Sequence, residues 1–256
     1  MTAGTIRGLA LASLSGESDA EWALRRQEWI DVAFLGGLAL DETTREAARA
    51  MVERGRDEFL TFEPFAWIRE QFGKLEGSGV RPAVNVRASS PQPLEEAARA
   101  VSEFDGILEI NAHCRQPEMI EAGSGHALLR DSGRLWEYLE AAQGCGVDVS
   151  LKARFEVPGV DSVSLLNRAA ENGLTYLHVD TMDSESLLRN VTGATVIANN
   201  GVREPKDLET MAGYGAGMVS VARGDRPEIL SILRDHIPCS GSLEERPRTP
   251  GRPPLS

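Results

Sequence analysis

The feature that most constrains the fold is a regular alternation of short strand-like segments with helical patterns. Eight segments have strand character, at residues 8–12, 31–35, 83–87, 107–111, 147–153, 175–179, 195–199 and 218–222. Several are continuous apolar runs, such as residues 195–198 (TVIA), which is typical of parallel strands covered by helices. Eight such units predict a (β/α)8 TIM barrel. A doubly wound open sheet is the alternative, because periodicity alone does not show whether a sheet closes.

Helical patterns lie between the strands, at residues 41–56, 65–72, 94–104, 134–143, 162–171, 184–189, 206–212 and 227–237. From Pro238 onward the chain is too rich in Pro, Gly and Ser to pack. A chain of 256 residues is within the size range of a single α/β barrel. We therefore expect one barrel domain over residues 1–237 and a disordered tail over 238–256.

The composition indicates a globular protein of a reducing compartment. The three cysteines, Cys114, Cys145 and Cys239, are widely spaced and form no C-x-x-C pair. This argues against a disulfide framework and against a metal site, and it fits the cytoplasm. No apolar run approaches the roughly 20 residues of a membrane span. We interpret residues 7–14 as the first strand rather than as a short signal segment.

The net charge of -12 bears on possible partners. A protein that binds a polyanion usually presents a basic face, and no basic cluster is visible in this sequence. Lysine occurs three times against 24 arginines, beside 39 acidic residues. An acidic, lysine-poor surface suggests a halophilic protein, because net charge keeps a protein soluble at high salt. The charge therefore weakens the case for a nucleic-acid partner without excluding one.

One stretch carries most of the functional signal, at residues 110–131 (INAHCRQPEMIEAGSGHALLRD). Asn111 and Cys114 come at or just past the end of a predicted buried strand, and Gly123 and Gly125 lead into a short helical pattern. The carboxyl ends of strands are where α/β enzymes place reactive side chains. An inert packed thiol is the alternative for Cys114.

Other strand ends also carry polar side chains. Lys152 ends the fifth strand, where a buried ammonium is costly unless an anion or acceptor meets it. Asn85 lies in the third strand, and His178 lies near the end of the sixth. For these three residues the alternatives are a solvated lysine, an amide satisfied by a neighbouring loop, and a satisfied core histidine.

The loops after the last two strands predict a phosphate site. Asn199, Asn200 and Gly201 follow the seventh strand, and Arg223 and Gly224 follow the eighth. In barrels of this kind such loops bring backbone amides and helix N-termini close to a phosphate.

The 110–131 stretch resembles the signature of the tRNA-dihydrouridine synthases, which is roughly N-x-G-C-P followed by a Gly-rich turn and A-L-L. Asn111 falls on the family's Asn, Cys114 on its reactive Cys, and Gly123 and Gly125 on its glycines. The resemblance implies an FMN-binding barrel that reduces the C5–C6 bond of a uracil ring in tRNA with electrons from NAD(P)H. It also implies that Cys114 delivers a proton to C5.

The resemblance extends to the other strand ends. Lys152 belongs to a K-x-R pattern and His178 to one similar to H-G-R-T, so both are implied to act beside the flavin. The loops after strands seven and eight are similar to the G-N-G-D and G-R-G loops that bind the FMN phosphate. The implied cofactor-binding residues are Ala12, Ser13, Asn85, Asn111, Lys152, His178, Asn199, Asn200, Gly201, Arg223 and Gly224.

The chain departs from the family pattern at several positions. His113 and Arg115 stand where the family has Gly and Pro, and both can lower the pKa of the Cys114 thiol. Asp180 replaces an Arg, repels phosphate and can instead orient His178. The last predicted helix ends near Ile237, where the family continues into a C-terminal helical domain that helps to hold tRNA.

These departures keep other functions open. The runner-up is a flavin oxidoreductase acting on a free pyrimidine or a dihydroorotate-like ring. The remaining alternatives are a phosphate-binding isomerase or aldolase that uses Lys152, and a non-catalytic barrel subunit.

Overall fold

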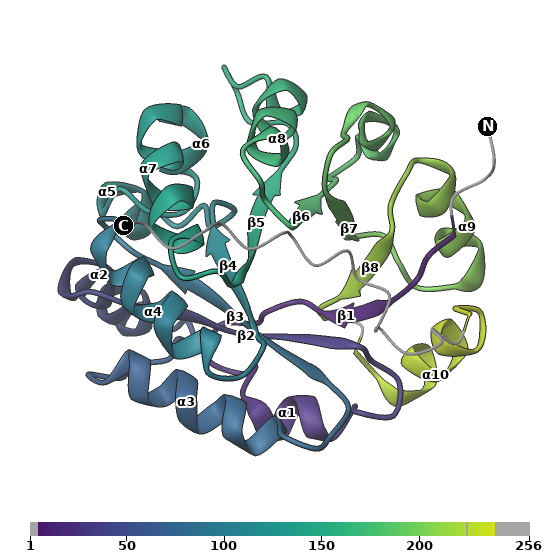
Figure 1. Cartoon of the computed structure of the whole chain (residues 1–256), viewed down its shortest axis with the longest axis horizontal. Helices are drawn as coiled ribbons and strands as arrows, with labels where there is room; N and C mark the ends of the chain where they lie inside the picture. Colours follow the sequence, from purple (N-terminus) through teal and green to yellow (C-terminus); the bar gives the residue numbers. More distant parts are fainter. Residues whose placement is uncertain (1–4, 224, 239–256) are drawn as a thin grey trace, which may run out of the picture.

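Eight parallel strands close into a barrel in the computed structural model, which describes residues 5–223 and 225–238. The strands follow sequence order around the barrel, and β8 pairs with β1 to complete it (Figure 1). They are β1 (Leu9–Leu11), β2 (Val32–Ala39), β3 (Arg81–Arg87), β4 (Ile107–Asn111), β5 (Asp148–Arg154), β6 (Tyr176–Asp180), β7 (Thr195–Asn199) and β8 (Met218–Val221). The (β/α)8 barrel is confirmed, and the open sheet is wrong. Gly224, Cys239 and the predicted tail from residue 239 onward lie outside the described residues.

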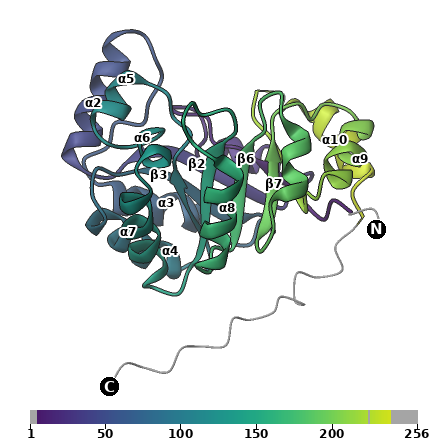
Figure 2. The same cartoon turned by 90° about the horizontal axis from the view of Figure 1, so that it is seen from above.

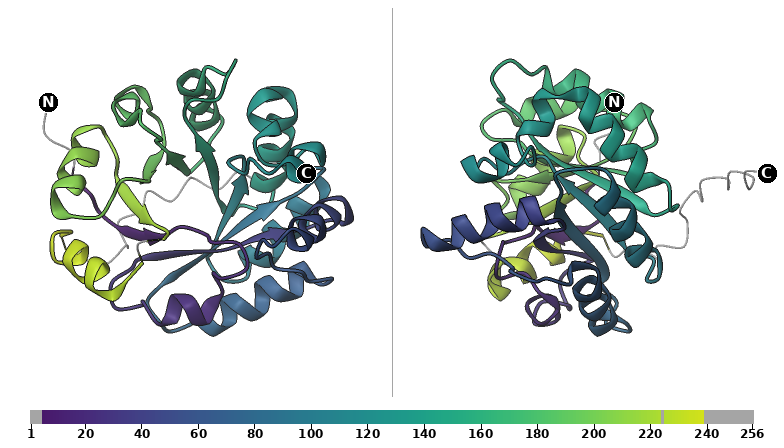
Figure 3. Two further views of the ribbon diagram at one scale, coloured as in Figure 1. Left: turned by 180° about the vertical axis from the view of Figure 1, so that it is seen from behind. Right: turned by 90° about the vertical axis from the view of Figure 1, so that its left-hand side faces the viewer.

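The helices form a layer around the outside of the barrel, as the front and rear views show (Figures 1 and 3). They are α1 (Ala20–Leu24), α2 (Glu42–Glu53), α3 (Pro64–Leu75), α4 (Gln92–Ser102), α5 (Pro117–Glu121), α6 (Ala127–Arg130), α7 (Ser132–Gln143), α8 (Ser162–Glu171), α9 (Pro205–Gly213) and α10 (Pro227–Asp235). The helix predicted at 184–189 is a 3-10 helix, η1 (Glu185–Asn190), and the short α1 and α5 were not predicted. None of the described helices is long and apolar enough to cross a bilayer.

Aspartate side chains define where several helices begin. The side chain of Asp41 accepts a hydrogen bond from the backbone amide of Thr44 at 2.9 Å, and Asp161 accepts one from Ser164 at 3.1 Å. Asp131 caps α7 in the same way. Each cap satisfies an amide that has no partner within the helix and contributes about 1 kcal/mol.

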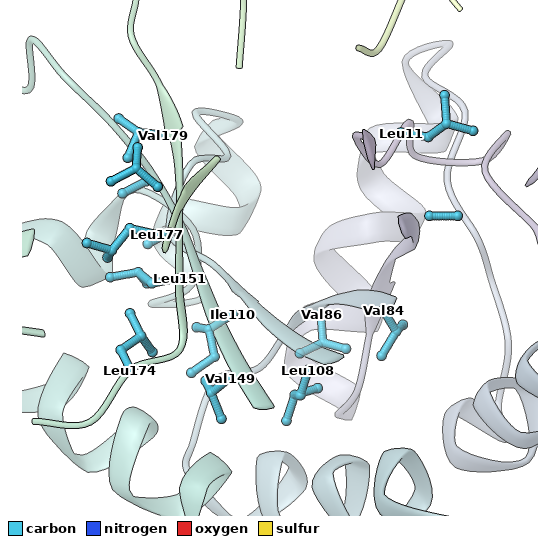
Figure 4. Close-up of a cluster of buried hydrophobic side chains, with 14 of the residues drawn as sticks. Leu11, Val84, Val86, Leu108, Ile110, Val149, Leu151, Leu174, Leu177 and Val179 are labelled. Carbon is cyan, nitrogen blue, oxygen red and sulfur yellow. The ribbon is translucent and has the colours of Figure 1, made fainter. Parts of the chain in front are cut away.

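The main hydrophobic core lies between the strands and the helices. Alternate strand residues point outward, so Leu108 and Ile110 of β4 pack beside Val149 and Leu151 of β5 (Figure 4). All four side chains are at most 1% exposed. Burying each of them contributes roughly 1.5–3 kcal/mol. This layer explains why the strands appear in the sequence as apolar runs.

The intervening strand residues point into the barrel and form layers. Near the amino ends of the strands the filling is apolar: Ala10, Val32, Phe34, Ala83, Ile107 and Ile197. The next layer toward the carboxyl ends is polar, with Asn85, Glu109, Ser150, His178 and Ser220 buried. The barrel is therefore closed by side chains at one end and lined by polar groups toward the other, which we call the mouth.

Candidate functional site

The mouth gathers polar side chains from the carboxyl ends of the strands. The strand register brings Asn111 of β4 opposite Lys152 of β5, and Arg154 of β5 opposite Asp180 of β6. Ser13 follows β1, and Arg87 ends β3. Residues separated by 167 positions in the sequence thus share one surface, as the prediction of a barrel site requires.

Glu109 is the centre of a hydrogen-bond network inside the barrel. Its side chain is fully buried and accepts hydrogen bonds from Asn85 Nδ2 at 2.7 Å and from Ser150 Oγ at 2.9 Å. Nδ1 of His178 lies 2.7 Å from its Oε2. Burial by itself would raise the pKa of Glu109, but the interaction with His178, the nearby charge of Lys152 and the hydrogen bond from Asn85 hold that pKa below its ordinary value.

The network continues from Glu109 to both sides. Asn111 Nδ2 donates to Asn85 Oδ1 at 2.8 Å, while Nε2 of His178 lies 2.8 Å from Ser220 Oγ. Burial lowers the pKa of His178, and the charge of Glu109 does not compensate. We therefore assign a neutral imidazole whose Nδ1 proton is donated to the Glu109 carboxylate.

In this tautomer the single Ser220 hydroxyl proton faces Nε2 of His178, and Ser220 Oγ also lies 3.1 Å from Asn199 Oδ1. Four of the residues predicted to bind the cofactor, Asn85, Asn111, His178 and Asn199, are thus joined through Glu109 and Ser220. The structure brings these residues together, while their contact with a flavin stays a prediction.

Lys152 is a buried cation without a close carboxylate. The residue is 4% exposed, and Nζ lies 3.5 Å from Ser13 Oγ. Within the described residues no carboxylate oxygen lies within 4.0 Å of this ammonium. Burial lowers the pKa of Lys152. The charges of Glu109 and Asp180 would raise this pKa, but they offset the effect of burial only in part. Such a group stabilises an anion or a carbonyl oxygen placed at the mouth.

The partner of Asp180 is His113. Oδ2 of Asp180 lies 2.7 Å from Nε2 of His113, so the expectation that Asp180 orients His178 is wrong. The two residues are 67 positions apart and meet because the loop after β4 crosses the end of β5. Burial lowers the pKa of His113, although the hydrogen bond that Asp180 accepts from it opposes this effect.

Cys114 lies on the opposite side of the same loop. It packs against a small apolar cluster that includes Met51 of α2 and Met119 of α5, two helices that lie side by side (Figure 2). Asn111 Oδ1 accepts hydrogen bonds from the backbone amides of His113 at 3.1 Å and Cys114 at 2.9 Å. The asparagine of the signature therefore holds the loop that carries His113 and Cys114.

The glycine turn of the signature supports this loop. Gly125 has φ +59, and a Cβ at this position would lie 2.6 Å from the carbonyl oxygen of Cys114. The amide of His126 donates to the same oxygen at 2.8 Å. Only glycine permits so close an approach of the two backbone segments.

Four buried polar atoms near the mouth have no hydrogen-bond partner among the described residues. They are Glu58 Oε1, Arg87 Nε, Ser124 Oγ and His126 Nε2. Glu58 and Arg87 are joined by another pair of atoms at 2.6 Å. Buried polar atoms without partners are costly, so their position around the mouth is consistent with a ligand that satisfies them.

The predicted phosphate loop after β7 lies at the carboxyl end of that strand. Asn200 and Gly201 have φ +82 and +77, and both are exposed. Asp207 already accepts hydrogen bonds from the amides of Arg203 and Glu204. Asn200 Oδ1 accepts a hydrogen bond from the amide of Gly201 at 3.0 Å. The amides of this loop are thus partly occupied by side chains of the chain itself, and a phosphate site here stays a prediction.

Some of these residues were not predicted from the sequence. Glu109 lies in the strand predicted at residues 107–111 but is not among the predicted site residues, although a single charge in an apolar run signals a position that faces the barrel interior. Ser150 and Ser220 occupy equivalent inward positions, and the Arg87–Glu58 pair was also not predicted.

The remaining described cysteine, Cys145, lies at the helical surface and donates to the Glu95 carbonyl at 3.7 Å.

Comparison with known proteins gives two kinds of similarity. The family model of dihydrouridine synthases matches residues 42–238. The uncharacterized protein MJ0144 of Methanocaldococcus jannaschii is 29% identical over 228 residues, which cover 84% of this chain and 88% of that protein. The matched region contains every strand from β3 to β8.

Solved structures show similarity of fold alone. A tryptophan synthase complex from Pyrococcus furiosus contains a chain with a TM-score of 0.58 and 13% identity, covering 90% of this chain and 98% of that one. A putative lyase/mutase from Burkholderia cenocepacia has a TM-score of 0.56 and 14% identity, covering 85% and 76%.

Proposed function

The chain belongs to the dihydrouridine synthase family, and we propose that it is an FMN-dependent oxidoreductase that reduces the C5–C6 bond of a uracil ring with electrons from NAD(P)H. We propose tRNA uridine as the substrate. The overall reaction adds one hydride and one proton to the ring, and it consumes one NAD(P)H and one proton from solvent.

The observation that carries this proposal is the buried Lys152 ammonium at the mouth. FMN, when bound, supplies the hydride for C6, and its reduced ring is an anion. Within the described residues the hydrogen-bond acceptor of Lys152 Nζ is Ser13 Oγ at 3.5 Å, so the ammonium fits a group that brings negative charge to this position. Among the described residues Arg87 Nε and His126 Nε2 also lack a hydrogen-bond partner, and they offer a bound group one donor and one donor or acceptor, respectively.

The other predicted residues receive roles that fit their positions. Ala12 and Ser13 line the end of β1, while Asn200, Gly201, Arg223 and Gly224 are proposed to hold the phosphate of FMN. Asn85, Asn111 and Asn199 position the side chains around them through the buried network. His178 is proposed to lie beneath the flavin, held by Glu109. Cys114 is proposed to deliver the proton to C5.

A free pyrimidine is the second candidate substrate. The acidic residue Asp180 at the mouth, paired with His113, is unfavourable for a phosphate near that point. The net charge of -12 is unfavourable for a large polyanion. We further propose a halophilic protein that works in the cytoplasm.

A substrate assay tests the proposal. The protein is loaded with FMN and given NADPH under anaerobic conditions with unmodified tRNA, with uridine monophosphate or with uracil, and dihydrouracil rings are quantified by mass spectrometry. Product from tRNA supports the lead substrate, and product from the small molecules alone supports the second. Absence of product in all three arms, with FMN bound, would contradict the proposed reaction.

Lysine variants test the cofactor site in the same preparation. Lys152→Met is expected to weaken FMN binding because it removes the buried cation. Lys206→Met is the matched control, since Lys206 is exposed and pairs with Glu204 at the surface. Equal FMN affinity in the two variants would remove Lys152 from the cofactor site.

A further inference from the structure

Two departures of this chain from the family pattern contact each other. His113 stands where the signature has Gly, and Asp180 stands where the H-G-R-T pattern has Arg. Their side chains, 29% and 13% exposed, meet with Nε2 and Oδ2 2.7 Å apart. A Gly and an Arg cannot form this pair, so the two substitutions together introduce a His–carboxylate dyad at the mouth.

The geometry of the dyad leaves one imidazole nitrogen available. Asp180 holds Nε2, while Nδ1 of His113 has no hydrogen-bond partner within the part of the chain that the structure describes. The Asp180 carboxylate on one ring nitrogen fixes the orientation of the ring and partly offsets the lowering of the His113 pKa by burial. The other nitrogen is then placed to exchange a proton with a bound molecule.

His113 and Cys114 are adjacent in sequence, but their side chains have different surroundings. Cys114 lies near the charges of Arg54 and Arg87 and packs against the α2 and α5 cluster. The titratable and charged groups around His113 come from β5 and β6, and from the turn before α6: Lys152, Arg154, Asp180, His178 and His126. His113 is thus the proton-transfer side chain of this loop that lies near Lys152.

We propose that His113 is a catalytic residue that protonates the carbonyl oxygen at C4 of the uracil ring, and that Asp180 positions it. The inference rests on the proposed function. As hydride adds to C6, the electrons of the C5–C6 double bond move toward C4 and negative charge develops on its oxygen. Protonation of that oxygen lowers the energy of this charge.

The step balances in protons and electrons. The imidazolium of His113 gives the Nδ1 proton to the C4 oxygen, which forms an enol. Cys114 then gives its thiol proton to C5, and the enol proton returns to Nδ1, so the C4 carbonyl is restored. The net change at the ring is one hydride at C6 and one proton at C5. Solvent returns the proton to Cys114, and NAD(P)H is the reductant.

The test uses the full chain loaded with FMN and three variants: His113→Asn, Asp180→Asn and the control His236→Gln. His236 is exposed at the end of α10 and bonds the Ile232 carbonyl, away from the mouth. The rate of flavin reduction by NADPH is measured separately from the rate of flavin reoxidation by the uracil substrate. We expect His113→Asn to slow only the second rate, by about 100-fold, and His236→Gln to change neither.

The pH dependence separates a catalytic dyad from a structural one. The acid form of His113 is needed, so reoxidation falls as pH rises through the pKa of His113. Asp180→Asn removes the hydrogen bond that raises this pKa, and the fall is expected to move to lower pH. NMR titration of the four histidines without FMN gives the same shift independently of turnover.

The experiment distinguishes a failure of the proposed function from a failure of the inference about His113. A wild-type protein that binds no FMN, or reduces no uracil ring, contradicts the proposed function and the inference with it. Wild-type ring reduction with an unchanged rate and pH profile in His113→Asn contradicts the inference alone. An unchanged His113 titration in Asp180→Asn would also overturn the assigned role of Asp180.

Discussion

Nδ1 of His178 lies 2.7 Å from Oε2 of Glu109, and both side chains are completely buried inside the barrel. This contact joins β4 to β6 beneath the mouth and connects the asparagines on one side with Ser220 on the other. The site therefore depends on a carboxylate that itself faces no solvent.

Replacement of Glu109 by Ala is expected to lower the free energy of unfolding by about 3 kcal/mol, because it leaves His178, Asn85 and Ser150 without their common acceptor. Urea denaturation followed by circular dichroism measures the change. Glu103→Ala is the control, since Glu103 forms an exposed ion pair with Arg69, and its effect is expected to be much smaller. Similar losses in both variants would show that the buried network does not stabilise the barrel.

Stability is expected to fall on acidification, starting near pH 6.5. The pKa of His178 is below its ordinary 6.5 because of burial, so the unfolded state binds more protons as pH falls through that value. Glu109 acts in the same direction at lower pH, because its pKa lies below the ordinary 4.5 and protonation removes its contribution. Denaturation between pH 4 and 8 checks the sign. His178→Gln should flatten the upper part of the curve, and an unchanged curve would refute the assignment.

Gly125→Ala is expected to destabilise the protein by more than 1 kcal/mol and to displace the Cys114 loop, because the new Cβ would lie 2.6 Å from a carbonyl oxygen. Gly77→Ala is the matched control, with φ +78 but no atom within 4 Å of the added Cβ. Both variants place alanine at a positive φ, so the difference between their thermal unfolding midpoints measures the cost of the close contact alone. Equal destabilisation in the two variants would mean that the positive φ alone accounts for the glycine at position 125.

Cys114→Ala is expected to keep FMN bound and to lower the rate of ring reduction at least 100-fold, since the proposed proton donor to C5 is lost. Cys145→Ala, at the helical surface, should leave both unchanged. Stopped-flow spectroscopy of the flavin gives both quantities. Full activity in Cys114→Ala would reduce this thiol to a packing role.

Added salt is expected to raise stability. The net charge of -12 means that acidic side chains repel one another at low ionic strength. Salt screens this repulsion, with a screening length of about 10 Å at 0.1 M that shortens as salt is added. The midpoint of thermal unfolding should therefore rise between 0.1 M and 2 M KCl. A falling midpoint would contradict the proposal of a halophilic protein.

The strand ends could be predicted from the sequence because a barrel fixes where functional side chains go. Lys152 and Asn111 occupy the mouth as the alternation of strands and helices requires. Glu109 was missed because the apolar residues on either side of it face the helices, and only their period of two shows that it faces inward.

The His113–Asp180 pair is of a different kind. It depends on the register of three strands and on the course of a loop, so a separation of 67 residues gives no local signal. The sequence showed both residues as departures from a pattern, but it did not show that they meet.

The central claim is that the mouth holds a flavin that passes electrons to a uracil ring. The visible absorption spectrum of the FMN-loaded protein tests it most directly, recorded anaerobically before NADPH, after NADPH and after addition of a uracil substrate. We expect flavin bands that bleach with NADPH and return with the substrate. A protein that stays colourless after incubation with FMN, or bleached bands that do not return with tRNA, uridine monophosphate or uracil, would contradict the account.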